Sequence, residues 1–377
     1  MSHTPFQISP VHWADPSRAS RFQLWLGEQA ACHHLNVGSL VLASADASFR
    51  RYLRIQTQDG GSRIIMDAPP DKENCQPFVH VARLMTDAGL NAPEVLAWDE
   101  ANGFMLLTDL GGQTLLQHMA TQGVGVGELY PQEAGERFLP LMKPVIAELV
   151  KWQQASRPGL LPAYDDALLS RELALFPEWY LAQHKGIDLN APEHAAKKQV
   201  LDDAFTRIKQ QVLKAPSVFV HRDFMLRNLM LNAGGAPGVL DFQDAVYGPI
   251  TYDIASLMRD AFVSWEEEFV MDVTIRYWSA AKKVGLIENG PWGDWADDFG
   301  AFYANVEWMG LQRHLKVAGI FARLTLRDGK PQYLADAPRF IHYIRHTCNR
   351  YGVLKPLMRL IDEIEDIQVE SGYQFGR

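Results

Sequence analysis

Two short apolar runs in the middle of this chain each lead into polar side chains suited to phosphate chemistry. Residues 219–220 lead into a His-Arg-Asp segment that ends at Asp223, and residues 238–240 lead into Asp241. Asn228 lies between the two. Short apolar runs bounded by polar residues are typical of buried strands. We therefore expect the three polar side chains to lie at the ends of short strands.

Together these side chains suit phosphoryl transfer from a nucleotide. Magnesium is usually held by one or two carboxylates or amides and by substrate phosphates, and Asn228 and Asp241 offer such oxygen ligands. The acceptor hydroxyl needs a carboxylate to take its proton, a role open to Asp223. A lone His-Arg-Asp is also typical of a strand that ends in a turn capped by aspartate. The combined spacing and the two apolar runs favour the catalytic interpretation.

The same residues resemble the H-R-D-x-x-x-x-N catalytic loop of the protein-kinase-like superfamily, with Asp241 standing where protein kinases carry D-F-G. The resemblance implies an α+β, bilobal protein-kinase-like fold that binds ATP and Mg²⁺ between its lobes. We expect residues 1–110 to form a small, sheet-containing nucleotide-binding lobe. Residues 111–377 are expected to form a larger, mostly helical lobe with the catalytic loop and the acceptor site.

The composition fits a globular protein with room for two lobes, because the chain has 377 residues of which 47% are hydrophobic. A net charge of −9 argues against broad binding to nucleic acid or to anionic membranes. Cys32, Cys75 and Cys348 are far apart and show no metal-binding spacing, which is typical of reduced thiols. No basic segment followed by an apolar run begins the chain, and no apolar stretch reaches spanning length. These features predict a cytoplasmic protein.

Hydrophobic periodicity places strands early and helices late in the chain. Strands are expected at 40–42, 49–55, 63–66, 94–98 and 104–108, the last two as a second strand pair, with helices at 17–36 and 74–89. From Thr114 onward the pattern is mostly helical, with helices expected at 137–152, 165–183, 193–213 and 251–262 and within 265–368. This order predicts a small sheet lobe followed by a helical lobe.

Two segments of the early part are candidates for contact with the nucleotide. The small residues at 44–48 would let backbone N–H groups approach phosphate oxygens, and Ser48, Phe49 and Arg51 are the candidate residues there. A plain hairpin is the alternative interpretation. After the strand at 104–108, the segment Asp109-Leu110-Gly111 is a candidate hinge whose backbone could hold the adenine edge. A simple strand-to-helix turn is the alternative for this segment.

The chain as a whole resembles the aminoglycoside phosphotransferase family. Within it, the chain is most similar to the cytoplasmic kinases that phosphorylate the anomeric hydroxyl of N-acetylmuramate and N-acetylglucosamine in peptidoglycan recycling. The segments behind this resemblance are 46–52, 65–70, 221–225, 240–245 and 313–317. It implies a small amino sugar and a nucleotide as partners, with Asp223 as base, Asn228 and Asp241 on magnesium, and 109–111 on adenine.

The chain departs from the superfamily pattern at one point. The usual lysine of the third strand and the usual glutamate of the following helix are both missing here. Arg51 or Arg54 on the preceding strand could reach the phosphates instead, because arginine binds phosphate bidentately. The alternative is that the nucleotide is held more weakly.

Three groups of residues beside the motif have supporting or substrate roles in this interpretation. Asp253 is expected to brace the catalytic loop, as the resemblance implies, and His221 and Arg222 are expected to be supports. Arg313 and His314 lie in a basic group that could form the anion-holding edge of an acceptor pocket. An ordinary solvated helix face is the alternative for that basic group.

Two other functions remain open on the sequence alone. A kinase for aminoglycosides or other small alcohols would share the fold, but polycationic acceptors would require several carboxylates. A nucleotide-binding regulator without catalysis would explain the missing lysine and glutamate. A protein kinase is disfavoured because no Ala-Pro-Glu element follows Asp241.

Overall fold

The computed structural model describes residues 11, 13, 15–45, 49–123, 129–130, 132–232 and 235–368. The candidate residue Ser48 lies outside this described part. The chain forms two compact units, Met1–Leu115 with Arg227–Asp244, and Leu116–Leu226 with Ala245–Arg377. The first unit thus also includes the later segment Arg227–Asp244. The sequence suggested a contiguous division at residue 110.

Backbone hydrogen bonds explain why that later segment packs with the first unit. The strands β8 (Leu229–Met230) and β9 (Gly238–Val239) form a small antiparallel pair. Leu231 donates its backbone N–H to the carbonyl of Gln113, and Val239 donates to the carbonyl of Asn91. Residues 227–244 therefore share their backbone bonding with residues 91–114, a long-range pairing that leaves no periodic signal in the sequence.

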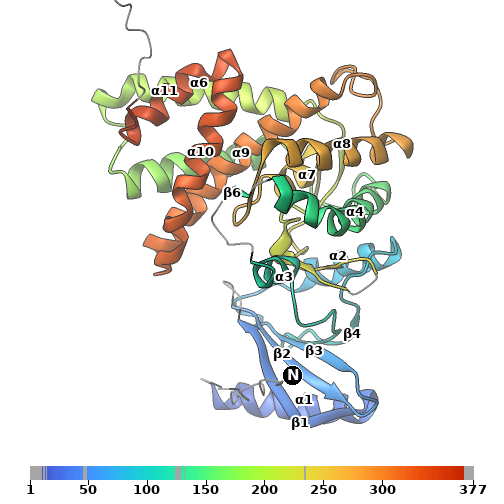
Figure 1. Ribbon diagram of the computed structural model, residues 1–377. Coiled ribbons are helices and arrows are strands. Elements are labelled where there is room, and N and C mark those ends of the chain that lie inside the picture. Colours follow the sequence, from blue (N-terminus) through green and yellow to red (C-terminus); the bar gives the residue numbers. More distant parts are fainter. Residues whose placement is uncertain are drawn as a thin grey trace, which may run out of the picture. The chain divides into compact units, whose positions relative to one another are not determined.

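The first unit is built on one five-stranded antiparallel sheet in the order β1-β2-β3-β5-β4 (Figure 1). Its strands are β1 (Leu35–Ala45), β2 (Arg51–Thr57), β3 (Ser62–Asp67), β4 (Val95–Asp99) and β5 (Phe104–Thr108). The two predicted strand groups join into one sheet because β3 pairs with β5, with Ile65 opposite Leu106. Strand β1 is longer than predicted, since His34 ends the preceding helix in a left-handed conformation and Leu35 pairs at once with Thr57.

Two helices cover apolar surface in this unit. Helix α1 (Pro16–His33) buries Phe22, Trp25 and Leu26 together with apolar residues of the sheet. Burial of large aromatic side chains is the main stabilising term for so small a sheet. Helix α2 (Gln76–Asp87) buries the predicted face of Phe78, Val81, Ala82 and Met85. The Phe78 ring lies 4.9 Å from the ring of Phe242, so α2 contacts the segment next to Asp241.

The second unit is mostly helical, as predicted (Figure 1). Its longer helices are α4 (Gln132–Gln154), α5 (Asp166–Leu175), α6 (Ala195–Val212), α8 (Glu267–Lys283), α9 (Phe299–Leu326) and α10 (Ala337–Arg350), and its shorter ones are α3 (Leu115–Thr121), α7 (Thr251–Met258) and α11 (Lys355–Ile364). Short strand pairs are β7 (Ser217–Val220) with β10 (Val246–Pro249), and β6 (Leu129–Tyr130) with β11 (Ser264–Trp265). No helix in the described part of the chain is long and apolar enough to cross a membrane.

Helix α9 forms the centre of this unit and is buried on nearly all sides. The predicted core face of Trp308, Leu311 and Leu315 is confirmed, because all three are buried. Buried polar residues lie between them on the same helix, so α9 is not an amphipathic surface helix. It packs against α5, α6, α7 and α10.

The helix predicted at 165–183 changes its winding halfway. Helix α5 continues into a π-helical segment, η1 (Phe176–His184). Pro177 has no N–H to give to a helical carbonyl and its ring crowds the preceding turn. The wider winding is visible where Lys185 donates its backbone N–H to Tyr180. Gly319 of α9 faces this junction, and a Cβ there would lie 2.3 Å from the Leu175 carbonyl oxygen.

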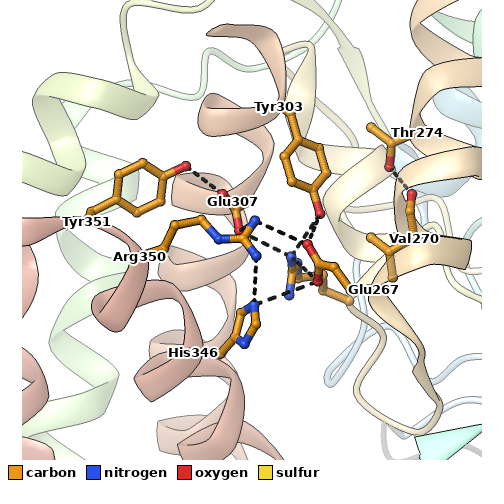
Figure 2. Close-up of polar contacts among 9 residues, drawn as sticks. Glu267, Val270, Thr274, Tyr303, Glu307, His346, Arg350 and Tyr351 are labelled. Carbon is orange, nitrogen blue, oxygen red and sulfur yellow. Dashed lines mark hydrogen bonds and ion pairs between the residues drawn. The ribbon is translucent and has the colours of Figure 1, made fainter. Parts of the chain in front are cut away.

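A cluster of charged side chains joins α8, α9 and α10 (Figure 2). Glu267, Glu307 and His346 present ligand atoms within 4.8 Å of one another, a spacing compatible with a metal ion. Arg259 and Arg350, however, each form ion pairs with both carboxylates. Two guanidinium groups already balance the two negative charges, so we interpret the cluster as an ion-pair network that stabilises the helical unit.

Replacing Glu307 by Gln tests this interpretation. The side chain of Glu307 is almost fully buried and also accepts the Tyr351 hydroxyl. Removing its charge leaves the buried Arg259 guanidinium short of a partner, a change that costs about 3–5 kcal/mol. We expect a loss of that size in the free energy of unfolding from denaturant titration. The matched change Glu268→Gln, at an exposed position of α8, should be nearly neutral, and equal effects for the two would contradict the network.

Candidate active site

The segment that carries Asp223 leaves strand β7 and is held by a buried carboxylate. Asp253, in the first turn of α7, accepts the backbone N–H of His221 at 2.7 Å and that of Arg222 at 2.9 Å. This confirms the prediction that Asp253 braces the loop. Arg222 has a φ of 75°, a left-handed conformation that is strained for a residue with a side chain. The two hydrogen bonds to Asp253 hold that conformation.

A second buried carboxylate holds the other end of the loop. Asp260 accepts the backbone N–H of Leu226 at 3.3 Å and that of Phe262 at 2.7 Å. Burial raises the pKa of Asp253 to about 7 and that of Asp260 to about 6, against the opposing effect of the N–H groups bonded to each. The loop around Asp223 is therefore fixed at both ends by buried carboxylates that bind its backbone.

The Arg222 side chain ends in a third buried site centred on Glu172 of α5. The Glu172 carboxylate accepts Arg222 at 2.5 Å, Lys316 at 2.8 Å, the Tyr164 hydroxyl at 2.7 Å and the Gln312 amide at 2.9 Å. Burial alone would raise the pKa of Glu172, but Lys316 and Arg222 lower it to about 2. An ionised carboxylate thus ties the residue before Asp223 to α5 and α9.

The sequence analysis missed Glu172. It lies about 50 residues before the motif in an ordinary helical pattern, and no local spacing distinguishes it. Only the fold shows that it is buried and meets Arg222.

Arg313 and His314 are both buried, with exposed fractions of 4% and 1%. Their interpretation as part of a solvated helix face is therefore wrong. Arg313 donates to the backbone carbonyl of Arg222 at 2.6 Å and lies over the Tyr252 ring. His314 stacks on Tyr343 at 4.5 Å, and its burial lowers its pKa well below the usual range, so the ring is neutral. Contact of Arg313 and His314 with an acceptor stays a prediction, whereas contact of Arg313 with the loop is observed.

The two predicted magnesium ligands lie together in the first unit. Asn228 ends a short 3₁₀ turn, η3 (Leu226–Asn228), and its side-chain amide donates to the Asp241 carboxylate at 3.2 Å. Leu240 donates its backbone N–H to the Asn228 carbonyl, and Gln243 donates its side-chain amide to Asp241. Asp241 has a φ of 64°. An amide and a carboxylate side by side form the hard-oxygen donor set that suits Mg²⁺.

Arg50, just before β2, and Arg51, the first residue of β2, are each paired with a carboxylate. Arg51 donates two N–H groups to one oxygen of Asp67, at 2.9 and 2.5 Å, and lies over the Trp13 ring. Arg50 pairs with Glu73, which also accepts the backbone N–H of Phe49. An arginine–glutamate pair therefore links the start of β2 to the segment before α2, although the superfamily lysine and glutamate are missing. Phe49 itself is 65% exposed, so its ring is available to a ligand.

The predicted hinge is fixed by Arg54. Asp109 accepts two N–H groups of Arg54, the Ser62 hydroxyl and the backbone N–H of Gly111. Arg54 also donates to the Gly111 carbonyl at 2.6 Å. Burial would raise the pKa of Asp109, but these bonds lower it. The Asp109 side chain thus shapes the hinge, and any contact of residues 109–111 with adenine would come from their backbone.

The chain belongs to the phosphotransferase enzyme family, whose family model matches residues 39–286. Its fold and its separate base and metal-ligand candidates are those of a small-molecule kinase of the protein-kinase-like type. A relative from Neisseria meningitidis serogroup B, named N-acetylmuramate/N-acetylglucosamine kinase, is 46% identical over 89% of this chain and 94% of the relative. Relatives of the same name from Pseudomonas aeruginosa (46% identical, 85% of this chain, 87% of the relative) and Caulobacter vibrioides (28%, 79% and 85%) also match.

Solved structures with little sequence similarity share the fold. An amicoumacin kinase in complex with AMP-PNP and Ca²⁺ has a TM-score of 0.57 at 15% identity, covering 84% of this chain and 91% of that one. A choline kinase from Cryptosporidium parvum has a TM-score of 0.56 at 12% identity, covering 90% and 99%. The predicted α+β, protein-kinase-like fold is confirmed.

Glu172→Gln tests the support of the loop. The change leaves Arg222 and Lys316 without their buried counter-charge, so we expect a loss of about 3–5 kcal/mol in the free energy of unfolding at pH 7. The folded-state pKa is lowered from 4.5 to about 2. The contribution of the carboxylate is therefore complete above pH 4.5 and is lost as the pH falls towards 2.

The stability gap between the natural protein and the Gln variant should accordingly be constant from pH 7 to pH 5 and shrink below pH 4.5. Denaturant titrations at several pH values measure it. Glu178→Gln, an exposed position on the same continuous helix, is the matched control and should show no gap. A gap for Glu172→Gln that did not change with pH would contradict an ionised carboxylate.

Proposed function

We propose that this chain is an ATP- and Mg²⁺-dependent cytoplasmic kinase that phosphorylates the anomeric hydroxyl of N-acetylmuramate and N-acetylglucosamine. The substrates are suggested by the names of three relatives that are 42–46% identical over most of the chain. The observation that carries the chemistry is the contact between Asn228 and Asp241 in one unit. In the other unit, two buried aspartates hold the loop that carries Asp223.

The proposed reaction assigns one task to each side chain. Asp223 takes the proton from the anomeric hydroxyl while the hydroxyl oxygen forms a bond to the γ-phosphorus. The bond from that phosphorus to the β–γ bridging oxygen breaks, and ADP leaves with the electron pair. Asn228 and Asp241 would hold Mg²⁺, which neutralises charge on the phosphate oxygens when bound.

Three buried side chains hold the backbone around Asp223 in place, so the loop does not have to be reordered at each turnover. Asp253, Asp260 and Arg313 bond to the backbone on either side of it. A base fixed in advance avoids the entropy of ordering during the reaction. An anomeric hydroxyl is also more acidic than an ordinary alcohol, so it demands less of a carboxylate base.

Asp223→Asn is the direct test of the base. An amide cannot accept the proton, so we expect the turnover number with N-acetylmuramate and ATP to fall by about 10²–10⁴-fold. ATP and Mg²⁺ should still raise the melting temperature, because Asn228 and Asp241 are untouched. Asp202→Asn, on the exposed face of α6, is the matched control. Unchanged turnover in Asp223→Asn would refute the assigned chemistry.

An acceptor panel tests the substrate class. N-acetylmuramate, N-acetylglucosamine and an aminoglycoside mixture are incubated at equal concentration with ATP and Mg²⁺, and phosphorus NMR locates the new phosphate. We expect sugar 1-phosphates as products. Activity on aminoglycosides alone would favour the alternative kinase, and nucleotide binding without ADP release would favour a regulator.

A further inference from the structure

A pocket of about 400 Å³ lies in the helical unit, built from elements that the proposed reaction does not use. Its walls are the end of the π-helical segment η1, the 3₁₀ segment η4 (Pro331–Asp336), helix α10 as far as Arg345 and the residues that follow α11. Most of these residues lie beyond 286, outside the range matched by the family model. The pocket is therefore largely a feature of the C-terminal helices and not of the phosphotransferase core.

One side of the pocket is a fixed polar wall. Tyr180 of η1 is 1% exposed, and its hydroxyl donates to Glu365 at 2.9 Å. Lys185 donates to the other oxygen of Glu365 at 2.8 Å, and its ammonium group lies 5.5 Å from the Tyr180 ring centre. These three side chains hold the end of η1 against the residues after α11. The wall is thus ordered before any ligand binds.

Other residues of the lining carry donors that no described residue accepts. Arg345 gives its Nε–H to Asp362 at 2.5 Å, and its terminal N–H groups have no partner among the described residues. The imidazoles of His184 and His342 also line the pocket, and neither has a hydrogen-bond partner within the described part of the chain. Ile341 and Leu334 supply apolar surface beside them.

The unused donors of the lining favour the oxygens of an anion. The charges around the pocket balance, because Lys185 pairs with Glu365 and Arg345 with Asp362. The guanidinium fork of Arg345 matches a carboxylate or a phosphate bidentately. The volume lies in the range of small-molecule sites, and π-helical segments occur frequently at functional sites.

We propose that this pocket is a second ligand site, which binds a small organic anion with a carboxylate or a phosphate monoester on a body of monosaccharide size. Arg345 and the two histidines hold the anionic group, and Ile341 and Leu334 contact the body. The site is separate from Asp223 and does not depend on the proposed kinase activity.

Isothermal titration calorimetry with the full chain tests the site. Glucose 6-phosphate serves as the phosphate-monoester probe, N-acetylmuramate as the carboxylate probe and glucose as the neutral control. We expect at least one anionic probe to bind, with an affinity that falls tenfold or more in Arg345→Gln. Any binding of glucose, the neutral control, should be the same in this variant as in the natural protein. For N-acetylmuramate the expected signature is the loss of one of two binding events.

Two further variants keep the result interpretable. His342→Gln changes an exposed side chain with no bond to the fold and should also weaken the anionic probe, which covers the case in which Arg345→Gln does not fold. Lys214→Gln, an exposed lysine away from the pocket, should leave binding unchanged. Kinase turnover should be unchanged in all three. The proposal would be overturned if neither anionic probe bound. It would also be overturned if Arg345→Gln and His342→Gln both bound the probe as tightly as the natural protein does.

Discussion

The hydrogen bonds from the backbone of residues 221 and 222 to the buried Asp253 carboxylate are the interaction on which the rest of the site depends. The chain must leave β7 through a left-handed residue, Arg222, in order to present Asp223. A strained residue of this kind costs of order 1–3 kcal/mol and persists only where its surroundings hold it. Asp253 bonds the backbone, Glu172 pairs with the side chain and Arg313 bonds the carbonyl of the same residue. The proposed base, Asp223, is therefore positioned through its neighbour Arg222.

The chemistry is divided along the chain between two compact units. Leu226 ends one segment of the helical unit and Arg227 begins the returning segment of the sheet unit. The proposed base thus belongs to one unit, and the proposed magnesium ligands Asn228 and Asp241 belong to the other. Phosphoryl transfer needs both sets at the same phosphate, so neither unit alone is expected to be active. In the sheet unit, Arg54 binds Asp109 and the Gly111 carbonyl, as Glu172 binds charged side chains in the helical unit.

Much of the fold was predictable because the helices and strands carry strong periodic patterns, as in the buried face of α2. The assignment of Asp223, Asn228 and Asp241 to the reaction comes from their local spacing and stays a prediction, of which only the contact between Asn228 and Asp241 is observed. The single five-stranded sheet, the return of residues 227–244 to the first unit and the role of Glu172 depend on contacts between distant residues. The basic group on α9 misled in one respect, because charge in sequence does not show that Arg313 and His314 are enclosed by other helices.

The most direct measurement is a crystal structure of the chain with Mg²⁺, a non-hydrolysable ATP analogue and N-acetylglucosamine. We predict Mg²⁺ within about 2.0–2.1 Å of oxygens from both Asn228 and Asp241. The Asp223 carboxylate should lie about 2.6–3.2 Å from the anomeric hydroxyl oxygen. A metal held without these two side chains, or a sugar bound with its anomeric hydroxyl directed away from Asp223, would contradict the proposed mechanism.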